Sequence, residues 1–136
     1  MQTSLPEMIA AIEAVLAKCS DGPFAATDSC VAHWVETETF GRISMALCHL
    51  IDGNYPQRLT DRSRADAHLI AALLNGLPER LAGAKRMLDS VDRLELSASP
   101  QDWDIAAEAR NIMTALIEPE YRALVASGAI QEDEHA

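Results

Sequence analysis

The side chains in this sequence that could do acid–base or metal chemistry are its four histidines and the carboxylates near them. His33 is close in sequence to Glu36 and Glu38, and His49 precedes Asp52; imidazole and carboxylate groups are common ligands of divalent metals. If the segment around His33 is a strand, however, His33 and Glu36 lie on opposite faces of it and cannot share an ion. We therefore expect no metal site and no cofactor.

Arg62 and His68 have the spacing of a ribonuclease motif found in some helical nucleases. The arginine would hold the scissile phosphate and the histidine would move a proton. The acidic balance of the chain would repel RNA, and Cys48 and His49 are too close in sequence to converge as a nucleophile and its base. We expect no catalytic residues, with a small metal-dependent or RNA-cleaving enzyme centred on His33, His49 and His68 as the alternative.

Acidic residues dominate the charge of the chain, with 21 Asp and Glu against 11 Lys and Arg and a net charge of −10 at pH 7. Such a chain is poorly suited to binding phosphate backbones and better suited to binding a basic protein surface. The same charge would also simply keep the protein in solution. The acids that we expect to contact a partner are Glu36, Glu38, Asp102, Asp104 and Glu108.

Helical periodicity organises most of the chain. A capping box at residues 4–7 begins a helix that runs to about residue 18. The longest apolar run spans residues 63–91, with Ser63 as its expected N-cap and Pro78 as an expected break or kink. A further helix is expected from residue 100 to 117, followed after Pro119 by a short last helix that Gly128 closes.

The apolar positions indicate which faces of these helices are buried. In the longest run, one face is predicted to carry Leu69, Ile70, Leu73, Leu74 and Leu77. The helix at residues 100–117 has an unusually wide apolar face, which would suit the interface of a homodimeric structural subunit.

Residues 24–54 allow two interpretations. In one, residues 30–36 and 42–48 form a β-hairpin, because apolar and polar residues alternate there. In the other, residues 42–51 form a helix, because Ile43, Ala46, Leu47 and Leu50 also share a helix face. Periodicity alone leaves both open.

Length and composition predict one folded domain over residues 1–130 and a disordered acidic tail at residues 131–136. Aromatic residues make up only 4% of the chain, which favours helices. We expect a mainly α, compact domain of four to five helices, with a short antiparallel hairpin near residues 30–48 as an α+β alternative. The three cysteines show no recurring spacing, which is typical of free thiols in a reducing cytoplasm. No stretch of apolar residues is long enough to span a membrane. We therefore expect a cytoplasmic protein.

The run Ala-Asp-Ala-His-Leu-Ile-Ala-Ala at residues 65–72, followed by Leu77-Pro78, resembles the small early-region accessory proteins of phages, of the Ead type. Their signature is similar to Ala-Asp-Ala-X-Leu-Ile-Ala-Ala with a later Leu-Pro, and the resemblance covers about residues 9–91. It implies a phage origin, no known enzymatic activity and an extended β segment between two helices. The chain departs from the pattern at Phe24, where a tryptophan is common.

Together these observations favour a non-enzymatic interaction protein that inhibits a host factor, such as an anti-CRISPR or other counter-defence inhibitor. Its expected partner is a host protein or nucleoprotein complex with a basic surface, which the acidic side chains would cover. We expect no direct binding of nucleic acid, no membrane association, and a homodimer as one alternative.

Overall fold

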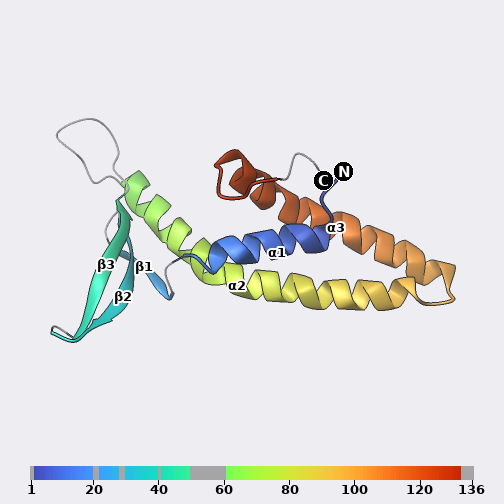
Figure 1. Cartoon of the computed structure of the whole chain (residues 1–136), viewed down its shortest axis with the longest axis horizontal. Helices are drawn as coiled ribbons and strands as arrows, with labels where there is room; N and C mark the ends of the chain where they lie inside the picture. Colours follow the sequence, from blue (N-terminus) through green and yellow to red (C-terminus); the bar gives the residue numbers. More distant parts are fainter. Residues whose placement is uncertain (1, 20–21, 28–29, 40, 50–60, 133–136) are drawn as a thin grey trace. The chain divides into compact units, whose positions relative to one another are not determined.

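The computed structural model describes residues 2–19, 22–27, 30–39, 41–49 and 61–132, which form three helices and three strands (Figure 1). In chain order the elements are α1 (Leu5–Leu16), β1 (Phe24–Thr27), β2 (Cys30–Thr37), β3 (Gly41–His49), α2 (Asp61–Glu95) and α3 (Pro100–Ala126). The mainly helical class is confirmed, and so is the hairpin interpretation near residues 30–48.

The contacts divide the chain into two compact units, residues 20–78 and residues 1–19 with 79–136. The single domain over residues 1–130 stays a prediction. No helix in the described ranges combines the length and the apolar character that crossing a membrane requires.

The described residues contain three helices instead of four or five because both internal prolines lie inside helices. Pro78 lies within α2 and Pro119 within α3. The predicted helix boundary at Pro119 was therefore wrong, as was the break at Pro78, whereas the alternative of a kink at Pro78 stays a prediction. Each proline removes one backbone hydrogen bond. The turns on both sides still continue the helix, since buried residues such as Ile117 and Tyr121 flank the proline and anchor α3. In α2, Ser63 is a buried residue of the first turns and not the N-cap that we expected.

In the unit of residues 20–78, the strands form an antiparallel sheet in the order β1-β2-β3. β1 pairs only with residues 30–33 of β2, whereas β2 pairs with β3 from Cys30 to Thr37. The far half of the β2–β3 hairpin is therefore a two-stranded arm that extends past β1. We call residues 34–39 and 41–44 the hairpin arm.

The sheet packs on an alanine row of α2. Val31 of β2 is buried against Ala67 and Ala71, whereas Leu69 and Leu73 are 60% and 51% exposed. The predicted apolar face was therefore wrong for these two leucines. The alanine side chains are small, so a strand can approach that row of α2 closely.

Asn75 joins α2 to β1. Its side-chain oxygen accepts a hydrogen bond from the Phe24 amide at 2.7 Å, and its side-chain nitrogen donates to the Phe24 carbonyl at 2.8 Å. One amide group thus satisfies both backbone groups of a strand residue 51 positions away in sequence. This pairing complements the apolar contact of the alanine row.

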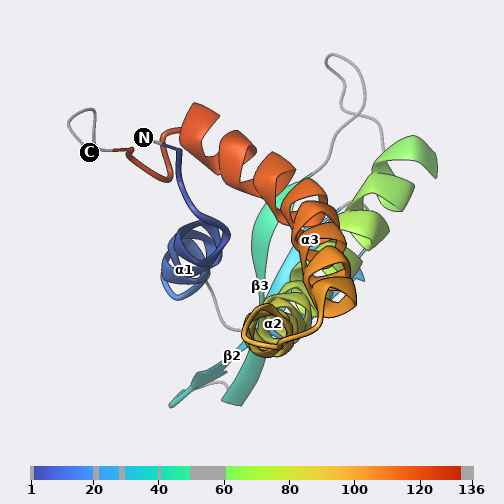
Figure 2. The same cartoon turned by 90° about the vertical axis from the view of Figure 1, so that its right-hand side faces the viewer.

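In the other unit, α1, the second part of α2 and α3 lie side by side (Figures 1 and 2). The predicted capping box begins α1: the Ser4 amide donates to Glu7 at 2.7 Å and the Glu7 amide donates to the Ser4 hydroxyl at 3.4 Å. The buried side chains of this core come from all three helices. They are Leu5, Met8, Ile9, Ile12, Leu81, Leu88, Val91, Ala106, Met113, Ile117 and Tyr121.

Charged pairs align α2 and α3. Arg110 reaches Asp92 at 2.6 Å and Glu95 at 2.5 Å, and Arg80 reaches Glu120 at 2.6 Å. The hydrogen bond from Arg110 lowers the pKa of Glu95 below its usual value. These pairs fix which residues of the two helices lie at the same height.

After α3 the chain turns at Gly128, whose φ of +83° favours glycine. Glu132 then accepts hydrogen bonds from the Tyr121 hydroxyl at 2.8 Å and from Arg122 at 2.9 Å. The tyrosine bond in particular lowers the pKa of Glu132. Of the predicted disordered tail, residue 132 is thus held on α3, and residues 133–136 lie outside the described residues.

Candidate interaction surface

The five acids predicted to contact a partner lie at two places. Glu36 lies at the end of β2 and Glu38 in the turn that follows, and both are exposed. Asp104 and Glu108 are exposed on α3. Asp102 is partly buried and accepts a hydrogen bond of 2.6 Å from the Ser97 hydroxyl, so its carboxylate belongs to the start of α3.

The hairpin arm places its two acids away from β1. Beyond His33, β3 is the one strand that pairs with β2 among the described residues. Glu36 is the last residue but one of β2, and Glu38 follows the end of the strand. No described side chain forms an ion pair with either of them. The arm therefore presents two exposed carboxylates on a two-stranded support, with Arg42 of β3 opposite Glu36 in the register of the strands.

A second exposed surface lies on α3. Ile105 and Ile112 are each 53% exposed and Leu116 is 69% exposed. Their positions differ by seven and four residues, so they form one row along the helix. Asp104 and Glu108 border this row at the next positions around the helix. The wide apolar face of residues 100–117 thus divides into a buried row and an exposed row. In the sequence, both rows together gave the face its width.

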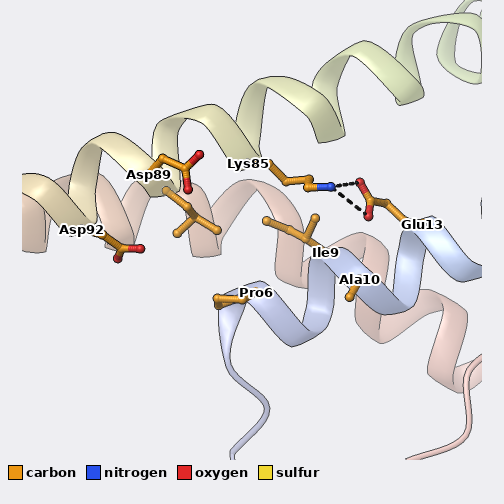
Figure 3. Close-up of a pocket in the computed structure, with 8 residues that line it drawn as sticks. Pro6, Ile9, Ala10, Glu13, Lys85, Asp89 and Asp92 are labelled. Atoms are coloured by element: carbon orange, nitrogen blue, oxygen red, sulfur yellow. Dashed lines mark hydrogen bonds and ion pairs between the residues drawn. The ribbon is translucent and has the colours of Figure 1, made fainter.

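A groove of about 330 Å³ lies between α1 and α2 (Figure 3). Its apolar wall includes Ile9 and Leu88. Lys85 closes one end by pairing with Glu13 at 3.3 Å, and Asp89 lines the same side of α2. The groove marks the seam along which α1 is seated on α2.

The histidines behind the enzyme alternative are not brought together by the described structure. The ring of His33 lies 6.4 Å from the ring of Phe24, and His68 is exposed on α2. Arg62 belongs to the same helix, and its side chain lies outside what the structure describes. The side chain of His49 lies outside the described residues. Among the described residues, no group of three potential ligands could hold a metal ion.

No family model, curated protein or solved structure matched this chain. The resemblance to Ead-type phage proteins over about residues 9–91 therefore remains an expectation from the residues alone.

Proposed function

We propose that this protein is a non-enzymatic interaction protein that inhibits a host factor by covering a basic surface with the acidic hairpin arm. The observation that carries the proposal is the pair of exposed carboxylates, Glu36 and Glu38, on the arm that β2 and β3 form in the part of the chain that the structure describes. The acidic balance of the chain supports it, because a negative protein is attracted over a distance to a positive partner.

The proposed mechanism is occlusion. The two carboxylates would take the positions of nucleic-acid phosphates against lysine and arginine side chains of the partner. A two-stranded arm, whose strands lie roughly 5 Å apart, can enter a groove that admits a nucleic-acid strand. The partner chemistry would suit a nucleoprotein complex of bacterial defence such as a CRISPR effector, in line with the phage resemblance.

The first test is binding to a host lysate at low and then at moderate salt. We expect the wild-type protein to retain a nucleic-acid-binding complex that salt releases, because exposed charge pairs are screened by ions. The E36Q/E38Q variant should lose this complex. A partner that moderate salt does not release would contradict the phosphate-mimic mechanism.

A matched control separates the arm from the overall charge. The D66N/E79Q variant also removes two exposed acids without a described ion pair, from α2. It should retain the partner. If both variants weaken binding equally, net charge and not the arm causes it. In cells with an active CRISPR system, wild-type protein should raise the plating efficiency of a targeted phage and E36Q/E38Q should not.

A further inference from the structure

The exposed apolar row of α3 continues onto α2. On α2, Lys85 and Asp89 mark the side on which α1 lies (Figure 3). Met87 is two residues from each of them, about 160–200° around the helix. Its side chain, which is 50% exposed, therefore faces away from α1.

The row on α3 faces the same way. Tyr121 marks the side of the chain's N-terminal segment, since its hydroxyl lies 3.4 Å from the Thr3 hydroxyl. Ile112 is about 180° around α3 from Tyr121, and Ile105 and Leu116 lie within about 40° of Ile112. We call Met87, Ile105, Ile112 and Leu116 the outer face of the α2–α3 pair.

The outer face has charged edges of opposite sign. On α3, Asp104 and Glu108 lie on the edge away from α2, because Arg110 points to the other side, toward Asp92. On α2, Arg86 and Arg93 lie on the edge away from α3, about 100–120° from Met87. Neither arginine has an ion-pair partner among the described residues.

We propose that the outer face binds a second copy of this chain. A two-fold axis parallel to the helices places α3 of each copy on α2 of the other, so that neighbouring helices are antiparallel in a four-helix core. The acidic edge of α3 then meets the basic edge of α2 in the other copy. α1 remains on the outside, where it covers the opposite face.

The heights of the charged residues agree with this pairing. Arg110 bonds Asp92 and Glu95 within one chain, so Arg93 lies at nearly the height of Arg110. A two-fold axis along the helices preserves that height. Arg93 of the second copy therefore lies within one turn of Glu108, close enough for an ion pair.

The contact is small. The row from Ile105 to Leu116 is roughly 17 Å long, and two helices are roughly 20 Å wide, which gives a projected area well below the roughly 800 Å² per partner of a standard interface. The dimer should therefore dissociate on dilution.

Sedimentation over a wide concentration range tests the proposal. The wild-type mass should change between one and two copies. L116E should raise the dissociation constant at least about tenfold, because it places a charge in the apolar contact. L96E is the matched control: Leu96 is 87% exposed, lies after the end of α2 and should leave the dimer unchanged.

A charge exchange identifies the second copy as the occupant. R93E and E108R should each weaken the dimer about threefold, and the double variant should restore it. A wild-type protein that stays monomeric, an L116E protein that still dimerises, or a double variant without restoration overturns the proposal. Loss of a host partner by L116E in a protein that is monomeric throughout would assign the face to that partner instead. E36Q/E38Q should dimerise normally, so the two proposals fail separately.

Discussion

At the scale of single residues, Asn75 has a role that two hydrogen bonds define. Its amide pairs with both the amide and the carbonyl of Phe24, as a neighbouring strand would. No other polar side chain is placed to substitute for it in the described contacts between β1 and α2. The attachment of β1 therefore depends on the amide having a donor and an acceptor.

N75A should lower the free energy of unfolding by about 1–2 kcal/mol, because two hydrogen bonds are lost. The Phe24 amide should exchange with solvent faster, which deuterium exchange measures. N75D keeps the acceptor but places a carboxylate oxygen against the Phe24 carbonyl. Relative to N75A, it should gain stability on acidification, when the protonated acid can donate; the opposite trend would contradict the assigned geometry.

Glu95 gives a pH dependence of known sign. Its pKa is lowered in the folded protein by the hydrogen bond from Arg110. A group with a lowered folded pKa stabilises the fold above its unfolded pKa, and this stabilisation is lost as the pH falls through the folded value. We expect the unfolding midpoint of E95Q to vary less with pH than that of the wild-type protein below about pH 4.5.

The control for this experiment is E79Q, which removes an exposed acid of α2 without a described ion pair. Its unfolding midpoint should follow the wild-type pH profile. If E95Q and E79Q give the same dependence of the unfolding midpoint on pH, the ion pair of Glu95 with Arg110 does not contribute to the pH dependence of stability.

At the scale of elements, α2 and the β2–β3 hairpin each contain a glycine, but only the glycine of the hairpin has a backbone conformation that requires glycine. Gly76 lies inside α2 and a Cβ added there meets nothing within 4 Å. Gly41 begins β3 with a φ of +69°, a conformation that other residues rarely adopt. The space around both is open, so only the backbone distinguishes them.

G76A should raise the free energy of unfolding by about 0.5–1 kcal/mol, because alanine loses less backbone freedom in a helix. G41A should lower it by about 1 kcal/mol, because alanine is strained at positive φ. Chemical denaturation of both variants measures these two changes in the free energy of unfolding. A destabilised G76A would show that α2 is not a continuous helix at this position.

At the scale of the whole molecule, the two proposals assign separate tasks to separate units. The hairpin arm belongs to the unit of residues 20–78, and the outer face belongs to the helical unit. If both hold, each dimer carries two acidic arms and can bind a partner with repeated basic sites more tightly than a monomer can. L116E, which keeps the arm but not the dimer, should then bind such a partner more weakly than the wild-type protein, as titration with the purified partner would show.

Much of the local structure could be predicted from the sequence because it depends on neighbouring residues. The capping box at Ser4 and Glu7 begins α1 as expected, and Ser99-Pro100 begins α3. The hairpin was one of two interpretations, since alternation and helical spacing coexist in residues 42–51. The pairing of β3 with β2 decided in favour of the hairpin. Such a pairing joins two segments and cannot be recognised in the pattern of either one alone. Likewise, the sequence identified the five acids of the candidate surface, but not which of them are exposed and which one is partly buried.

Only the tertiary structure decided which apolar rows are buried and whether the prolines end their helices. On α2 the sheet covers Ala67 and Ala71 and leaves Leu69 and Leu73 exposed. The hydrophobic effect has no direction, so a sequence with two adjacent apolar rows does not specify which one meets the core. That choice depends on the shape of the element packed against it. For the same reason, Pro119 stays within α3, where contacts of Ile117 and Tyr121 on both sides outweigh one missing hydrogen bond.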